Sequence, residues 1–248
     1  MLPRTGRRAV PALVLLVLLV CGGCGRAVRG KAEDRIDAVL PRYLGPADRY
    51  ETRIDAASAG AVLRGHLRLI HIVGTRVQLR PNLVVDTLTL DARSVTADPR
   101  RGTLTAVESA AFRCRISAAH LQSYLISRRL GIPDLSLETQ GEFLVVRARP
   151  DLLGVVPVPV RVKGLPVPEA SGDLLDFVPD RASVTILPVP RVLLSYFSRR
   201  LNPIVDLRDL PVAIHVDTAA VESGALVLTG TVPPDTLLRA ANATATGN

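Results

Sequence analysis

Hydrophobic and polar residues alternate with a period of two across residues 50–116. Leu67 and Leu69, for example, alternate with His66 and Arg68, and the same pattern recurs through the rest of this region. Because successive side chains of a strand point to opposite faces of a sheet, the pattern predicts several antiparallel strands joined by short turns. One face of the predicted sheet is apolar and the other polar, so we expect the sheet to be covered on its apolar face only and to expose the other face to solvent.

A helical period replaces this alternation over residues 117–130. Ser117 is a good N-cap, and a glycine and a proline follow the last apolar position. Leu121, Tyr124 and Leu125 share one face of the predicted helix.

A second helix is predicted over residues 190–201, with Pro190 in its first turn and Asn202-Pro203 at its end. Its sequence, which includes Tyr196 and Phe197, resembles that of the first helix. Each helix precedes two strand-like runs, which are 135–139 and 143–147 after the first and 212–216 and 225–231 after the second. These segments indicate a repeated helix-hairpin unit, or a chance likeness between two amphipathic helices. Residues 155–162 alternate Val and Pro, which predicts an extended segment unsuited to a central strand.

The N-terminus has the layout of a secretory signal. Three arginines precede an apolar run from Ala9 to Val20, and small residues follow it. The run holds about a dozen residues, whereas a helix needs roughly twenty to cross the hydrocarbon core of a bilayer. Beyond it, residues 31–44 have the spacing of a short amphipathic helix, whose regularity Pro41 limits.

The segment Gly22-Gly23-Cys24 resembles the lipobox of bacterial lipoproteins, although Cys21 stands where leucine is usual. Cleavage before Cys21 would place the bulky Val20 beside the cut, so Cys24 is the predicted site of acylation. Ordinary cleavage near Gly25 is the alternative. A twin-arginine signal at Arg7-Arg8 lacks the aromatic-leucine pair that usually follows. We expect an exported, palmitate-bearing lipoprotein of a bacterial cell envelope, facing the periplasm or extracytoplasmic space.

Composition fits one folded domain, with 48% hydrophobic and 22% charged residues. The net charge is +8, and without the signal arginines 28 basic residues face 23 acidic ones. This mild excess favours docking to an anionic membrane surface. No dense basic run or aromatic-rich basic motif indicates nucleic-acid binding. Beyond Cys24 the chain holds only Cys114, which alternation places on an apolar strand face as a buried, inert thiol.

The minimum parts of a catalytic or metal site are missing from the sequence. Metal ligation would draw on His66, His71, His120 and His215. His66 and His71 fall on opposite strand faces with no cysteine or carboxylate cluster nearby, so surface or core histidines explain these residues better. Serine hydrolysis would need a G-x-S-x-G elbow, which the chain lacks. Two pairs could be imagined as acid–base couples, Asp86 with Asp91 and Asp206 with Asp209, but solvated turns and strand faces explain these residues better. We therefore expect a protein that is not an enzyme and has neither metal nor cofactor.

Two motifs resemble the LmeA-like phospholipid-binding proteins of bacterial envelopes. They are residues 116–125, similar to the opening of the family's main helix, and Asp209-Leu210-Pro211 leading to residues 224–230 of a closing hairpin. The resemblance covers residues 48–232 and implies an α+β fold. In that fold a curved antiparallel sheet wraps around one long helix plus a second helix, similar to the tubular lipid-binding (TULIP) superfamily.

The sequence and the resemblance together predict four segments, which are a signal peptide (1–23), a lipid-tethered segment (24–47), a lipid-binding domain (48–232) and a flexible tail (233–248). The resemblance implies that phospholipid acyl chains lie between helix and sheet, with the headgroup near an arginine. We expect the chains to contact five residues, Leu121, Tyr124, Leu125, Tyr196 and Phe197. The alternative is a structural or adaptor lipoprotein that docks an envelope-protein partner through a sheet edge.

Overall fold

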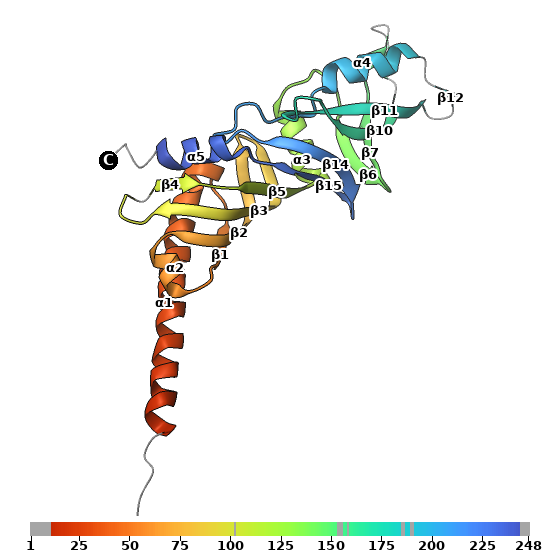
Figure 1. Ribbon diagram of the computed structural model, residues 1–248. Coiled ribbons are helices and arrows are strands. Elements are labelled where there is room, and N and C mark those ends of the chain that lie inside the picture. The colour runs from red at the N-terminus through yellow and green to blue at the C-terminus, as the bar shows by residue number, and fades with distance from the viewer. Residues whose placement is uncertain are drawn as a thin grey trace, which may run out of the picture.

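The computed structural model describes residues 11–101, 103–152, 156–157, 159–184, 187–188 and 191–243. Figure 1 shows an elongated molecule in which one sheet lies beside the upper part of α1 (Pro11–Leu44) and a second sheet forms the far end. The described strands pair antiparallel in both sheets, and helices accompany them. The fold is therefore α+β with antiparallel sheets, as the sequence predicts.

The first sheet curls into a half-barrel (Figure 1). Its strands are β1 (Arg49–Asp55), β2 (His66–Arg80), β3 (Leu83–Asp98), β4 (Thr103–Ala106), β5 (Ser109–Ser117), β14 (His215–Glu222) and β15 (Ala225–Thr231). They lie in the order β1-β2-β3-β5-β15-β14, and β4 pairs with β3. The alternating pattern of residues 50–116 thus forms four of the strands and β4, and the closing hairpin β14–β15 adds two more.

The second sheet was not expected, because the resemblance implies a single one. Its strands are β6 (Ser136–Gln140), β7 (Phe143–Ala148), β10 (Val160–Pro168), β11 (Leu174–Val184), β12 (Leu187–Pro188) and β13 (Val205–Asp206). The order is β12-β11-β10-β7-β6, and β13 pairs with β11. A separate ribbon joins β8 (Asp151–Leu152) to β9 (Val156–Pro157). Contacts between β10 and β14 connect the two sheets.

The proline-rich segment 155–162 is divided between two places in the structure. Val156–Pro157 form β9 of the separate ribbon, whereas residues 160–162 begin β10, a central strand of the second sheet that was not expected there. Val160 and Val162 pair with β7 on one side and β11 on the other. The pairing with β7 ends at Gly164, whereas the pairing with β11 continues to Pro168. Pro166 therefore lies where one side of β10 has no partner strand, which is where a residue without an N–H is tolerated.

The two predicted helices are present with nearly the predicted bounds. α3 (Ala118–Ser127) begins after Ser117, whose hydroxyl accepts a hydrogen bond from the His120 N–H. α4 covers Arg191–Leu201. Each precedes a hairpin, but β6–β7 joins the second sheet whereas β14–β15 joins the first. The first strand of the second hairpin begins at His215, and residues 207–214 form a loop where a strand over 212–216 was expected.

α1 is a continuous helix through Pro41 to Leu44, longer than the short helix predicted over residues 31–44. Two of its carboxylates fix it to the edge strand β1. Glu33 Oε1 accepts from the Ile54 N–H at 2.8 Å, and Asp37 Oδ1 accepts from the Thr52 hydroxyl at 2.6 Å. Among the described residues, no helix is long and apolar enough to cross a membrane. Residues 1–10 of the predicted signal and the side chain of Cys24 lie outside the described part of the structure.

A helix also occupies part of the segment predicted to be a flexible tail. α5 covers Pro234–Ala243 and packs Leu237 and Leu238 against the core. The Asn242 side chain accepts from the Leu104 N–H at 2.9 Å and donates to the Leu104 carbonyl at 2.8 Å. These contacts fix the helix beside β4, so the described end of the chain is ordered by packing. Residues 244–248 lie outside the described residues.

Candidate functional site

The concave face of the half-barrel is lined by apolar side chains from neighbouring strands. Leu88 of β3, Cys114 of β5 and Leu228 of β15 form one row across the sheet, because β5 pairs with β3 on one side and β15 on the other. Leu90 and Phe112 are directly opposite each other in the next row. The strand period therefore places these side chains on one face, as the sequence predicts.

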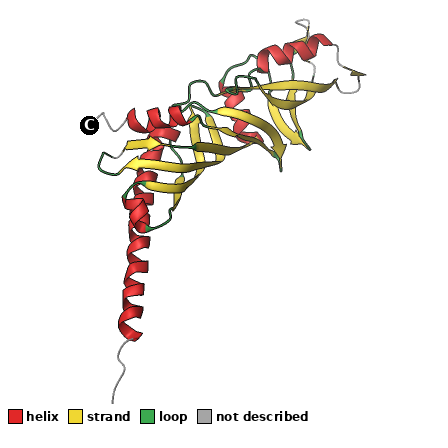
Figure 2. Cartoon of the chain, viewed as in Figure 1, coloured by secondary structure: helices red, strands yellow, loops and turns green. Residues whose placement is uncertain are grey.

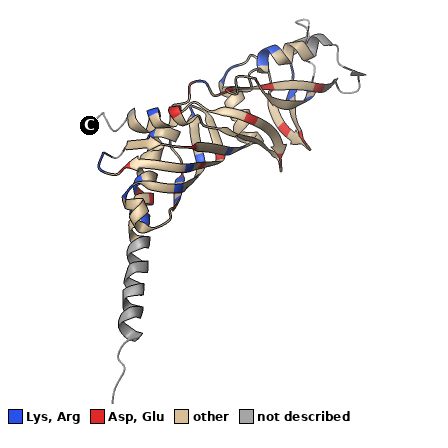
Figure 3. Ribbon diagram, viewed as in Figure 1, with Lys and Arg blue, Asp and Glu red and all other residues tan. Residues whose placement is uncertain are grey.

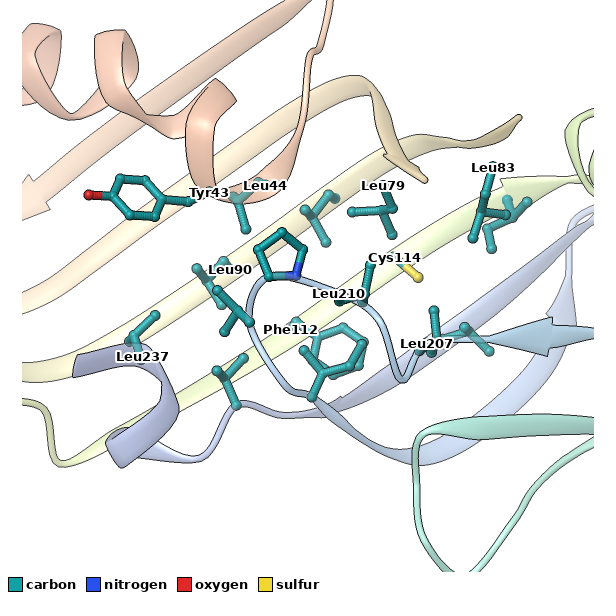
Figure 4. A pocket seen from close by; sticks show the side chains of 17 residues that line it. Tyr43, Leu44, Leu79, Leu83, Leu90, Phe112, Cys114, Leu207, Leu210 and Leu237 are labelled. Atoms are coloured by element: carbon teal, nitrogen blue, oxygen red, sulfur yellow. The ribbon is translucent and has the colours of Figure 1, made fainter. Parts of the chain in front are cut away.

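A cavity remains between this face and the segments that cover it (Figure 4). The cover consists of the end of α1, the loop 207–214 and α5. Its lining residues are Tyr43, Leu44, Leu79, Leu83, Leu88, Leu90, Phe112, Cys114, Ile116, Leu207, Leu210, Pro211, Val212, Ile214, Leu228, Val232 and Leu237. The volume is about 60 Å³, and the lining is almost entirely apolar.

A second apolar cavity of about 230 Å³ continues the first along α1. The two share five lining residues, which are Tyr43, Leu44, Leu90, Val212 and Leu237. The second adds Ile36, Val39 and Leu40 of α1, and Ile70, Ile72, Ala92 and Val95 of the sheet, among others. The two cavities together are here called the apolar channel.

Two hydrogen bonds position the end of α1 over the apolar channel. The Tyr43 hydroxyl donates to the Ala241 carbonyl of α5 at 3.3 Å, and the Tyr50 hydroxyl donates to the Gly45 carbonyl at 2.7 Å. Gly45 has a φ of +95°, and a Cβ there would lie 2.2 Å from the Gln78 carbonyl oxygen. Only glycine lets the chain turn this close to β2 as it leaves the helix.

Charged residues hold the loop 207–214 at one edge of the channel. Arg80, next to the lining residue Leu79, donates to the Asp206 carbonyl at 2.6 Å and to the Asp209 carboxylate. Hydrogen bonding from the Arg208 side chain lowers the pKa of Asp206 to about 2, so this carboxylate is charged at neutral pH. Arg80 therefore connects the end of β2 to the segment that covers the cavity.

Cys114 is buried in the cavity wall, as predicted from its strand position. Burial raises the pKa of its thiol to about 12, which keeps it protonated at neutral pH. Gly230 lies opposite Phe112, and a Cβ there would come within 2.8 Å of the phenyl ring. The glycine thus leaves room for an aromatic side chain on the concave face.

The five residues predicted to contact acyl chains do not line the apolar channel. Leu121, Tyr124 and Leu125 are the buried residues of α3, which contacts β3, β5 and β6. Phe197 is fully buried in α4, and the half-buried Tyr196 makes an edge-on contact with its ring at a centroid distance of 5.5 Å. Four of the five side chains thus belong to the hydrophobic core, and Tyr196 packs against it.

The region of α3 and α4 is joined by arginine side chains rather than by a shared cavity. Arg128, which follows α3, donates to the Pro203 carbonyl beyond α4. Arg200 of α4 donates to the Leu130 carbonyl at 3.2 Å and to the Gly131 carbonyl at 3.0 Å.

The sequence signal for the segment that covers the cavity was the motif Asp209-Leu210-Pro211. Asp209 contacts Arg80, and the other two residues line the cavity.

Within the described residues, no group of three or more His, Cys, Asp or Glu side chains is placed to hold a metal ion. His71 Nδ1 lies 2.6 Å from Asp91 Oδ1. His120 Nδ1 lies 3.0 Å from Asp86 Oδ1, although the geometry is not that of a hydrogen bond. Asp86 and Asp91 thus each face a histidine. Asp206 and Asp209 both face Arg80.

Comparison with known proteins supplies the family. Neither the curated proteins nor the solved structures contain a match to this chain. The family model of LmeA-like phospholipid-binding proteins matches residues 25–231, a range that includes the half-barrel, the second sheet and the charged cover of the cavity. The chain therefore belongs to the LmeA-like phospholipid-binding family.

Proposed function

We propose that the protein binds a phospholipid by holding an acyl chain in the apolar channel of the half-barrel. The observation that carries the proposal is the lining of the cavity, whose side chains are hydrocarbon apart from the Tyr43 hydroxyl and the Cys114 thiol. The Tyr43 hydroxyl is already bonded to the Ala241 carbonyl. Burial contributes about 0.8 kcal/mol for each methylene group removed from water, which favours an acyl chain over a polar ligand. Membership of a phospholipid-binding family supports the same ligand.

Uptake of the lipid requires the cover to move. The two cavities measure about 60 and about 230 Å³, whereas pockets for small ligands span roughly 300–1,000 Å³. The loop 207–214 is the segment we expect to move, because its Asp209 side chain is 76% exposed, whereas the partner Arg80 is 21% exposed. Ion pairs that water reaches contribute only about 0–1 kcal/mol.

Arg80 is the arginine that we propose for the lipid phosphate. It lies at the edge of the channel, and its guanidinium already binds a carboxylate there. A phosphate group offers the same two-oxygen geometry, so it can replace Asp209 when the loop moves. The acyl chain would then extend from Arg80 along the concave face, in the manner of a tubular lipid-binding domain.

We also propose that the protein is exported and tethered by an acyl group on Cys24. The signal-like layout of residues 1–23 supports export. The family match begins at Gly25, directly after the proposed acylation site, which supports a mature chain that starts at Cys24. Such a chain would lie in the bacterial cell envelope, anchored to a membrane and facing the periplasm or extracytoplasmic space.

Photo-crosslinking tests the binding site. A phospholipid with a diazirine in its acyl chain is incubated with the protein, irradiated, and mapped by peptide mass spectrometry. We expect adducts in the strands that carry Leu90, Phe112 and Leu228. Adducts confined to α3 or α4, around Tyr124 or Tyr196, would instead favour the site expected from the sequence. No adduct, together with a stoichiometric protein partner in pull-downs from cells, would favour the adaptor role.

A further inference from the structure

The end of the half-barrel at which α2 (Ala59–Leu63) lies combines an exposed apolar side chain with basic residues. Leu63 is 61% exposed, more than any other large hydrophobic side chain among the described residues. It is the last residue of a helix that Ser58 caps, and Arg64 follows it. α2 also contacts α1. Leu63 is therefore held at a fixed position on the surface, beside a positive charge.

Positive charge is concentrated around this helix. Residues 27–35 and 53–68 carry six Lys or Arg side chains and three Asp or Glu side chains. Two of the three acids are engaged within the protein, since Glu33 accepts from the Ile54 N–H and Asp55 pairs with Arg68 at 2.9 Å. Figure 3 shows basic residues around α2 and the adjoining part of α1.

Five of the basic side chains are exposed, those of Lys31, Arg35, Arg53, Arg64 and Arg68. Within the described residues, only Arg68 pairs with one of the three acids, Asp55. The positive surface is consequently open to solvent and is only partly neutralised by its neighbours.

α1 connects this surface to the proposed tether. The helix is continuous from Pro11 to Leu44 and passes α2 on its way to β1. Lys31 lies seven residues after Cys24, a distance of about 10 Å along a helix that rises about 1.5 Å per residue. An acyl group on Cys24 would thus hold the α2 end of the domain within reach of the headgroups.

We propose that the α2 end of the half-barrel docks on the surface of an anionic phospholipid bilayer, with Leu63 inserted among the headgroups and Lys31, Arg35, Arg53 and Arg64 facing lipid phosphates. The proposal builds on the proposed lipid-binding function but uses a different part of the molecule. Charge complementarity and the direction of α1 toward Cys24 identify the bilayer as the occupant. The part of the channel lined by residues 36–44 of α1 would then be the part nearest to the membrane.

Vesicle flotation tests this surface without the tether. The chain from Gly25 to Asn248 keeps the buried hydrophobic core, which lies between Leu40 and Val232. Its binding is compared on vesicles of phosphatidylcholine alone and with 40 mol% phosphatidylglycerol. We expect binding to the anionic vesicles that falls as salt is raised, because surface charges are screened.

Matched substitutions locate the binding surface. Arg64→Glu should lower vesicle affinity about fivefold or more, since one basic residue near an anionic surface changes affinity by about that factor. Leu63→Ser should also lower it, because less apolar surface is removed from water on insertion. The controls Val178→Ser and Arg199→Glu make the same changes at exposed positions on β11 and α4 and should leave affinity unchanged. Circular dichroism confirms that all four variants are folded.

Equal binding to both vesicle types, no binding to either, or equal losses in the control variants would overturn the docking proposal. The photo-crosslinking experiment distinguishes the absence of membrane docking from the absence of lipid binding in the channel. Leu63→Ser should still crosslink to detergent-dispersed lipid through the channel, because Leu63 is not one of the residues that line it.

Discussion

Arg80 joins the sheet to the loop over the cavity through two different groups, a main-chain carbonyl and an exposed carboxylate. The carbonyl contact is part-buried, whereas Asp209 is mostly open to solvent. Loss of the carboxylate should therefore loosen the loop without unfolding the domain. At the scale of single residues, the rate of lipid exchange should depend on this ion pair.

Asp209→Asn should accelerate transfer of a fluorescent phospholipid from protein to acceptor vesicles by up to about fivefold, since an ion pair that water reaches contributes about 0.2–1 kcal/mol to the closed state. Stopped-flow fluorescence measures the rate. Glu222→Gln is the matched control, because Glu222 pairs with Arg113 away from the channel. An unchanged rate in Asp209→Asn would exclude the ion pair as a restraint on the loop.

Asp206 should make the stability of the protein sensitive to acid. Its pKa is about 2, below the ordinary value of 3.8, mainly because Arg208 donates a hydrogen bond to its side chain. The folded state therefore gains stability from the carboxylate above about pH 4, and loses it as the pH falls toward 2. In urea unfolding, Asp206→Asn should be less stable than the parent at pH 6, and the difference should shrink toward pH 2. A difference that is constant with pH would contradict this.

At the scale of elements, α5 closes one side of the apolar channel. Leu237 lines both cavities, and Asn242 makes the two hydrogen bonds that hold the helix to Leu104 of β4. The helix is short, so its position depends on these contacts more than on its own propensity.

Asn242→Ala should destabilise the docked helix by about 1–3 kcal/mol, because both partner groups on Leu104 lose their side-chain contacts. We expect stronger fluorescence of an apolar dye such as Nile red as the channel opens, with little change in far-UV circular dichroism. Arg239→Ala on the exposed part of the same helix serves as the control. Equal dye binding in both variants would show that α5 does not close the channel.

Elements with strong local signals were predictable from the sequence. Ser117 marked the start of α3, and the strand-like runs 135–139 and 143–147 marked the hairpin β6–β7. α5 was missed because the small, polar residues after Ala240 masked the apolar pair Leu237 and Leu238. The second sheet was missed because its pairing depends on contacts between distant strands, which no local period reveals.

The candidate site was predictable only in part for the same reason. The period of two placed Cys114 on an apolar strand face, and the structure confirms it. The loop 207–214 has no regular period, so its place over that face follows from the tertiary fold. Phe197 belongs to the buried core and Tyr196 packs against it, on a helix that contacts β11 of the second sheet, so neither lines the apolar channel.

At the scale of the whole molecule, α1 extends the domain toward its proposed membrane anchor (Figure 2). Two attachments are therefore proposed, an acyl group on Cys24 and the basic surface around α2. They differ in strength, since an acyl anchor withstands high salt whereas an electrostatic contact is screened by it.

Cys24→Ala should abolish incorporation of an alkyne-labelled palmitate in cells, detected after conjugation to a fluorophore. Any Cys24→Ala protein that sediments with membranes should be released by 1 M salt, whereas the parent protein should stay bound. Cys21→Ala, three residues earlier, is the control and should retain both the label and the salt resistance. Label retained in Cys24→Ala would show that the acyl group is attached elsewhere.

Native mass spectrometry of the chain from Gly25 to Asn248, purified from bacteria, tests the central claim most directly. We expect one phospholipid per chain in the parent protein. Leu90→Trp, which enlarges a residue shared by both cavities, should be folded but nearly free of lipid, whereas Tyr196→Trp on α4 should keep it. The absence of bound lipid from the parent, together with no uptake of added phospholipid, would contradict the account.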